Sequence, residues 1–205
     1  MMSRDTGRTG KPAGSSLLKS MDAILSDGYE SATINQRSNT MSNDKNQSET
    51  KRQRLDFLMR KREGAARREE LSDLLARNNV PAESLKDLDE SDELRATIRE
   101  GARAARRQNQ LTAATADDYH GIVRLSQAAI NEDLPSRTCL VLFTDSDLIG
   151  VVEINPNQLA ETVGQLLEFD EDSLIVTNHG AEAGFISQRF ESDDSISYQI
   201  ERWSY

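Results

Sequence analysis

The chain has 205 residues, of which 36% are hydrophobic and 5% aromatic, and its 25 Lys and Arg residues against 35 Asp and Glu residues give a net charge of −10. These apolar and aromatic fractions are low for a fully packed globule, so we expect part of the chain to lie outside any core. The longest apolar run, Cys139 to Phe143, is too short to span a bilayer, and no apolar stretch of signal-peptide length follows the polar N-terminus. We therefore expect a cytoplasmic protein that has no membrane partner.

Residues 1–46 are rich in Ser, Thr, Asn, Gly and charge, which predicts a mostly disordered segment. Residues 15–27 break this pattern, because their apolar side chains recur at helical spacing on one face. These side chains are Leu17, Leu18, Met21, Ile24 and Leu25. An isolated helix of this length is marginal in water and needs a groove to lie in, so it is a candidate docking helix. The alternative is that translation begins at Met41 and that the first forty residues have no function.

Charged helices are predicted over residues 47–112, and we interpret them as docking arms. The first covers residues 49–78 and ends at Val80-Pro81, because proline cannot continue the helical hydrogen bonding and restricts the residue before it. Its intermittent apolar edge includes Leu55, Leu58 and Met59. The second helix covers residues 91–110.

Two basic surfaces are predicted on these helices. Residues 51–68 carry eight Lys and Arg residues against two acids, a net charge of +6. The second helix places a stripe of guanidinium groups along its axis. The stripe consists of Arg95, Arg99, Arg103 and Arg106. It suits an acidic protein, the acidic domain of the same chain or of a second copy, or nucleic acid, although ordinary solvation of a charged helix explains the same residues.

Residues 113–205 are predicted to form an acidic α+β domain. A helix capped by Thr115 comes first, with Ile122 and Ile130 on its core face. The segments CLVLF and LIGVVEI, separated by TDSD, predict a hairpin, and a second helix begins at Pro156. Three further strands follow as SLIVT, AGFISQRF and SISYQIERW. The order α-β-β-α-β-β-β predicts a small antiparallel-rich five-stranded sheet with helices on one face.

This domain is strongly acidic. Beyond Arg137 the chain has two basic residues against thirteen acids, a net charge of −11. Acids in its predicted turns are candidate contacts for a cationic protein, because charge complementarity sets partner choice. They are Asp170, Glu171, Asp172, Asp193 and Asp194.

Motifs for catalysis or for cofactors are weak throughout. Asp145 and Asp147 resemble the start of a calcium loop, but Ile149 and Pro156 stand where an EF-hand needs ligands. His179 lies in the Gly-rich segment NHGAEAG and is the candidate base for a small enzyme. No metal, cofactor or catalytic residue is predicted.

The leading hypothesis is therefore a non-catalytic protein-interaction or adaptor protein. Its acidic domain would bind a cationic protein, as an immunity protein or a dedicated chaperone does, and its helices would bind protein partners or form a homo-oligomer. One alternative is a nucleic-acid-binding protein that uses the Arg-rich helices, which the acidic net charge makes the weaker reading. A second alternative is a small enzyme that uses His179.

Overall fold

The computed structural model describes residues 42–108, 111–134, 138–170, 172–192 and 195–204, without the side chains of 42–50 and of Arg106. These residues belong to one compact unit, Ser38–Tyr205. Within the described ranges, every helix is too short or too polar to cross a membrane.

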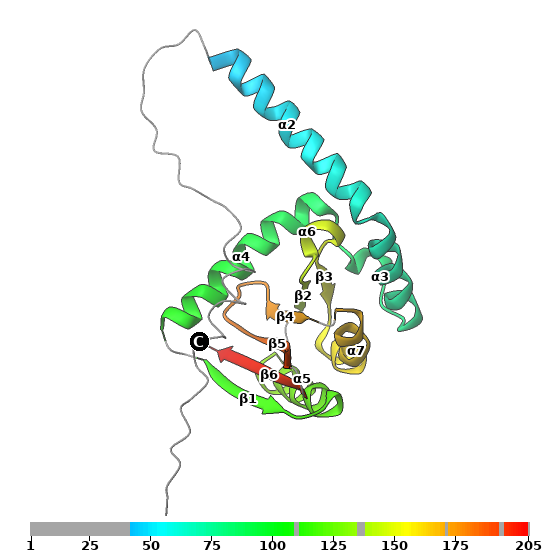
Figure 1. The fold of residues 1–205 in the computed structure, drawn as a ribbon, viewed down its shortest axis with the longest axis vertical. Helices are drawn as coiled ribbons and strands as arrows, with labels where there is room; N and C mark the ends of the chain where they lie inside the picture. The colour runs from blue at the N-terminus through cyan, green and yellow to red at the C-terminus, as the bar shows by residue number, and fades with distance from the viewer. Residues whose placement is uncertain (1–41, 109–110, 135–137, 171, 193–194, 205) are drawn as a thin grey trace, which may run out of the picture. The chain divides into compact units, whose positions relative to one another are not determined.

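Six strands form a single antiparallel sheet (Figure 1). In spatial order they are β1 (Thr112–Ala116), β6 (Ser195–Ser204), β5 (Ala183–Ser192), β4 (Ser173–Asn178), β2 (Cys139–Phe143) and β3 (Val152–Ile154). The predicted α+β class is confirmed. The five predicted strands are all present, and the structure adds β1 as a sixth strand at one edge.

Strand β1 lies where the sequence predicts the start of a helix. The segment TAATA pairs with β6, so that Ala114 faces Ile200, and Thr115 is therefore in a strand and is not a helix cap. The helix α5 (Tyr119–Asp133) begins three residues later than β1 ends. Asp118 is its N-cap and accepts a hydrogen bond from the Gly121 backbone N–H at 2.6 Å. A short carboxylate side chain at this position satisfies an amide that the first helical turn leaves unpaired.

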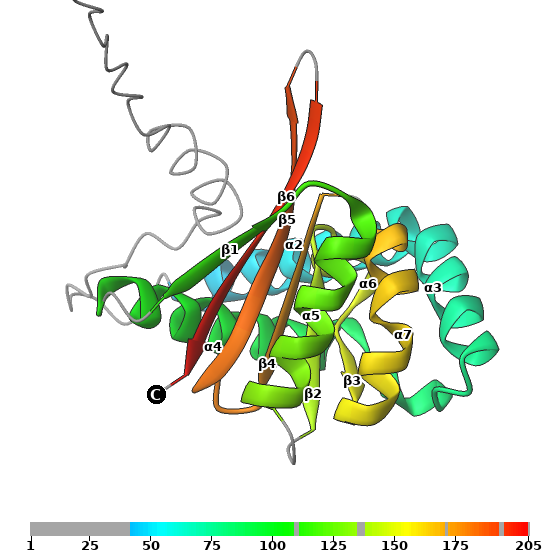
Figure 2. The same cartoon turned by 90° about the horizontal axis from the view of Figure 1, so that it is seen from below.

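Two helices cover one face of the sheet (Figure 2). They are α5 and α7 (Pro156–Phe169), and α7 begins at Pro156 as predicted, with Asn155 as its N-cap. Ile122 and Leu159 from these helices are buried in the same cluster as Val141 and Phe185 from the strands. Burial of this face accounts for the clear helical periodicity of both segments.

The opposite face of the sheet is covered by α4 (Leu88–Arg107), which packs against β6 (Figure 2). Its Ile98, Ala102 and Ala105 are at most 2% exposed. The strand side chains that alternate with the α5 and α7 face are buried as well. They include Leu140, Leu142, Ile175, Ile186 and Trp203. The sheet therefore has helices on both faces, and the prediction of helices on one face only was wrong in this detail.

The long helix predicted over residues 49–78 is divided at Gly64 into α2 (Ser42–Glu63) and α3 (Ala65–Arg77). Helical hydrogen bonds continue through the division, from Gly64 N to Arg60 O at 2.9 Å and from Arg68 N to Gly64 O at 2.8 Å. A Cβ atom on Gly64 would lie 2.1 Å from the Leu148 carbonyl oxygen. The close approach of another backbone thus explains the glycine at the bend.

The connection between β2 and β3 is also longer than a turn. The two strands pair antiparallel as predicted, but a short helix, α6 (Ser146–Ile149), lies between them. Gly150 follows it with φ of 97°, a conformation that only glycine adopts easily. This helix is the element that both α2 and α3 contact.

Helices α3 and α4 belong to the packed unit. Leu71 and Leu75 of α3, together with Val80, are buried in the main core cluster, and a short 3-10 helix, η1 (Ala82–Ser84), connects them to α4. The segment that we interpreted as docking arms therefore contributes core side chains through most of its length. Helix α2 alone carries large exposed apolar side chains within that segment.

Candidate interaction surface

Helix α2 presents an apolar face to solvent. Leu55, Leu58 and Met59 follow the spacing i, i+3, i+4 and are 58%, 53% and 51% exposed. Residues at this spacing lie side by side on one face of a helix. Scattered single apolar residues are ordinary on protein surfaces, whereas three neighbouring ones on a single helical face form a patch. We call these three side chains the α2 apolar face.

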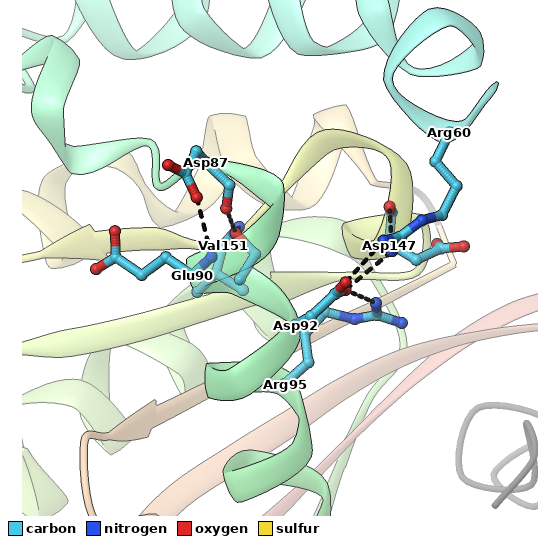
Figure 3. A network of polar contacts seen from close by, with 8 residues as sticks. Arg60, Asp87, Glu90, Asp92, Arg95, Asp147 and Val151 are labelled. Atoms are coloured by element: carbon cyan, nitrogen blue, oxygen red, sulfur yellow. Dashed lines mark hydrogen bonds and ion pairs between the residues drawn. The ribbon is translucent and has the colours of Figure 1, made fainter. Parts of the chain in front are cut away.

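The opposite side of α2 is held by the rest of the unit. Arg60 donates from Nη1 and Nη2 to the two carboxylate oxygens of Asp92 at 2.9 and 2.7 Å, and also to the Asp147 carbonyl at 3.3 Å (Figure 3). Phe57 lines a hollow of about 120 Å³ together with Leu148. Phe57, Arg60 and Gly64 share one face, so α2 turns its polar and aromatic face inward and its aliphatic face outward.

Electrostatics reinforce this anchor. Asp92 also accepts a hydrogen bond from Arg95 at 3.0 Å. Burial alone would raise the pKa of Asp92, but the hydrogen bonds and charges of Arg60 and Arg95 hold the pKa below its usual range. The hydrogen bond to Asp92 likewise raises the pKa of Arg60. One carboxylate of α4 thus joins two guanidinium groups from two helices.

Two further basic residues serve as internal anchors of α3. Arg68 donates to the carbonyls of Ile149 and Leu85, and burial lowers the pKa of its guanidinium. Arg67 donates to the Phe169 carbonyl and stacks 4.0 Å above the Phe169 ring. Of the eight basic residues predicted to form a surface over 51–68, five are exposed. These are Lys51, Arg52, Arg54, Lys61 and Arg62.

The predicted Arg stripe on α4 is not a continuous surface. Arg95 is only 12% exposed at its side chain, because it packs inward to reach Asp92. Arg99 is partly buried and takes part in an interaction, and Arg103 is exposed. The side chain of Arg106 lies outside the described residues. A guanidinium that already pairs inside the fold is a poor phosphate ligand, which weakens the nucleic-acid alternative for this helix.

The predicted acidic contacts divide into three groups. Asp170 is 6% exposed, so its assignment as a surface contact was wrong. Its carboxylate accepts hydrogen bonds from the Thr144 backbone N–H and hydroxyl and from the Asp172 N–H, which explains why it faces inward. Burial raises the pKa of Asp170. Asp172 is exposed, and Glu171, Asp193 and Asp194 lie outside the described residues.

His179 is exposed, and its Nε2 lies 3.1 Å from Glu153 Oε1, while Glu153 pairs with Lys86 at 2.5 Å. Cys139 is buried, and burial raises the pKa of its thiol to about 12, so the reactive thiolate is suppressed. In the part of the chain that the structure describes, no three His, Cys, Asp or Glu side chains are placed to hold a metal ion. His179 therefore belongs to an ion-pair cluster in which Glu153 and Lys86 are partly buried.

The predicted docking helix of residues 15–27, with Leu17, Leu18, Met21, Ile24 and Leu25, lies outside the described residues, as does Met41. Comparison with protein-family models, with curated proteins and with solved structures finds no match to this chain. Any function must therefore be argued from the surfaces themselves.

Sequence periodicity identifies Leu55, Leu58 and Met59 as an apolar edge, but it does not show which way that edge points. The direction is set by Gly64 and Arg60, which fix the opposite face of α2 against α6 and α4. Eight basic residues close together in the sequence also look alike, and only the fold separates the three anchors from the five exposed ones.

Proposed function

We propose that this protein is a non-catalytic interaction protein whose helix α2 binds a groove on an acidic protein partner. The observation that carries the proposal is the exposure of the α2 apolar face on a helix whose other face is already anchored. Neighbouring large apolar side chains on a helix are normally buried against its own fold. Here Leu55, Leu58 and Met59 form a local patch on an otherwise polar helix, and that patch is turned toward solvent, where another molecule can contact it.

The energetics favour a helix-in-groove mode of binding. Burying a fully exposed Leu or Met side chain yields about 1.5–3 kcal/mol, and Leu55, Leu58 and Met59 are 58%, 53% and 51% exposed, so burial of the remaining surface supplies part of a moderate affinity. The helix is already formed and its C-terminal end is fixed by Arg60, which reduces the conformational entropy lost on binding. The three anchors follow the i, i+3, i+4 spacing by which helices engage apolar grooves.

The charge around the apolar face indicates the chemistry of the partner. On a helical wheel Lys51, Arg52 and Arg62 fall on the same side as Leu55 and Met59, and all three bases are exposed. A groove with carboxylates at its rim would match this ring of bases. Such complementarity raises the association rate and weakens as salt screens it.

The test uses the full-length chain, in wild-type form and as Leu58→Ser, to capture proteins from the source cells. Each captured protein is then purified, and its affinity for both forms is measured at low and at high salt. We expect an acidic partner whose binding weakens roughly tenfold or more with Leu58→Ser, because one buried anchor is lost. Ile196→Ser is the matched control, since Ile196 is 45% exposed and lies on β6.

The proposal is overturned if the purified partner binds Leu58→Ser as tightly as the wild type, or if Ile196→Ser weakens binding equally. A second experiment measures the oligomeric state of the protein alone by sedimentation. A dimer that Leu58→Ser dissolves would assign the α2 apolar face to a second copy. Salt-dependent retention of DNA or RNA, lost with Arg52→Gln, would assign the helix to nucleic acid.

A further inference from the structure

A hollow of about 300 Å³ opens between α5, the C-terminal end of α7 and the β5–β6 pair. Its walls combine apolar and acidic side chains. The apolar part is formed by Ile122 and Leu167 with the rings of Tyr119 and Tyr198, and acidic side chains come from Glu168 and Asp172. A volume of this size accommodates a small organic group.

The uncompensated charge of the hollow is negative. Arg189 also lines it, but this guanidinium already pairs with Glu191. The carboxylate of the buried Asp170 already accepts hydrogen bonds from Thr144 and Asp172, so it is not free to bind a ligand. Glu168 and Asp172 are exposed, and within the described ranges neither carboxylate pairs with a basic side chain. Burial raises the pKa of Tyr119 to about 12, and Glu168 contributes to that rise through its charge and a hydrogen bond with the ring hydroxyl. The carboxylate of Asp172 is thus open to a cation that enters, and that of Glu168 is shared with Tyr119.

The aromatic wall is suited to the same kind of ligand. The Tyr119 and Tyr198 rings meet edge to face, with centroids 6.4 Å apart and planes at 70°. The Tyr119 hydroxyl donates to the Gly164 carbonyl, which fixes the orientation of that ring. The negative face of an aromatic ring attracts ammonium and guanidinium groups, and the attraction grows when water is excluded.

We propose that this hollow binds a primary ammonium or guanidinium group carried on an alkyl chain. The cationic head lies between Glu168 and Asp172 near the tyrosine rings, and the methylene groups pack on Ile122 and Leu167. A free diamine and a Lys or Arg side chain of a polypeptide both offer this chemistry. The hollow contains no residue of α2, so the inference stands independently of the proposed function.

The experiment titrates the full-length protein with 1,4-diaminobutane, with an acetylated and amidated lysine tripeptide, and with butyrate as the anionic counterpart. Isothermal calorimetry and amide chemical shifts at Tyr119, Asp172 and Tyr198 report binding. We expect millimolar or tighter affinity for at least one cation, and none for butyrate. Asp172→Asn should weaken it roughly tenfold, because it removes a charge-assisted hydrogen bond.

Glu161→Gln is the matched control, because it removes the same charge from an exposed position of α7 that does not line the hollow. Thermal unfolding of each variant verifies that the fold is retained. Binding of the diamine alone assigns the site to small amines, and binding of the peptide alone assigns it to a side chain of a polypeptide. No cation binding, equal binding of butyrate, or equal weakening by Asp172→Asn and Glu161→Gln would overturn the inference.

Discussion

Some polar residues that the sequence predicts to be exposed to solvent are buried and determine the local structure. Asp170 lies in the acidic run after α7, yet it is buried because its carboxylate collects hydrogen bonds from Thr144 and Asp172. These contacts link the end of β2 to the start of β4. A carboxylate that satisfies several buried donors costs less to bury than an unpaired one, although desolvation still raises its pKa.

Replacing Asp170 with Ala should destabilise the fold. The change leaves the Thr144 N–H without its acceptor in a part-buried position, and an unsatisfied buried donor costs about 1–3 kcal/mol. Urea unfolding of the purified variant measures the loss as a lower midpoint. Asp172→Ala, at the exposed neighbouring position, should change stability by less than about 0.5 kcal/mol. Equal effects of the two substitutions would contradict the structural role of Asp170.

At the scale of elements, the helices α5 and α7 and five of the strands are predictable from the sequence, because the periodicity of apolar residues indicates which face of an element is buried. β1 is not, since TAATA has neither large apolar residues nor alternation, and it forms by pairing with β6. Helix α6 is not predictable either, because its sequence SDLI resembles a turn followed by the start of a strand. The kink at Gly64 depends on the approach of Leu148, a contact distant in sequence.

The anchor of α2 should be sensitive to acid. The pKa of Asp92 is lower in the folded protein than in the unfolded chain, where it is about 4. The ion pair with Arg60 therefore contributes its full stabilisation of the fold above about pH 4. That contribution is lost as the pH falls through the lower pKa of the folded protein. Arg60→Met should therefore reduce stability at neutral pH, by no more than about 1 kcal/mol because the pair is partly exposed. Once the pH has fallen below the lowered pKa of Asp92 in the folded protein, the two forms should converge.

Urea unfolding of the wild type and of Arg60→Met over a pH series measures this difference. Arg54→Met is the control, because Arg54 is an exposed base of the same helix and the contacts of the anchor are made by Arg60. A stability difference for Arg60→Met that stays constant from neutral to acidic pH would show that Asp92 does not mediate it.

For the molecule as a whole, the two-sided burial of the sheet is the main departure from the sequence prediction. Strands such as CLVLF are apolar at every position, which is typical of a sheet covered on both faces. The sequence predicts a helix over residues 91–110, but the thin apolar edge of that helix does not indicate that it covers the second face of the sheet. Small side chains such as Ala102 and Ala105 let α4 approach the sheet closely, and they contribute little to any hydrophobic pattern.

The fragment that begins at Thr112 should therefore fail to fold, although it contains the complete sheet. Without α4, side chains such as Leu140, Ile186 and Trp203 would be exposed, and each buried large side chain contributes about 1.5–3 kcal/mol. Near-ultraviolet circular dichroism and thermal unfolding measure the result. The fragment that begins at Ala65 retains α3 and α4 and should fold cooperatively. A folded Thr112 fragment would show that α4 is dispensable.

The pairing of the first strand with the last has a consequence for biosynthesis. Thr112 of β1 faces Arg202 of β6, about ninety residues later in the chain. At about 5–20 residues per second, a ribosome needs roughly 5–20 s to deliver that partner. During this interval β1 is made but cannot join the sheet, and the α4 face lacks Trp203. The nascent chain thus exposes apolar surface until synthesis has reached β6, which makes it a natural client for a ribosome-associated chaperone.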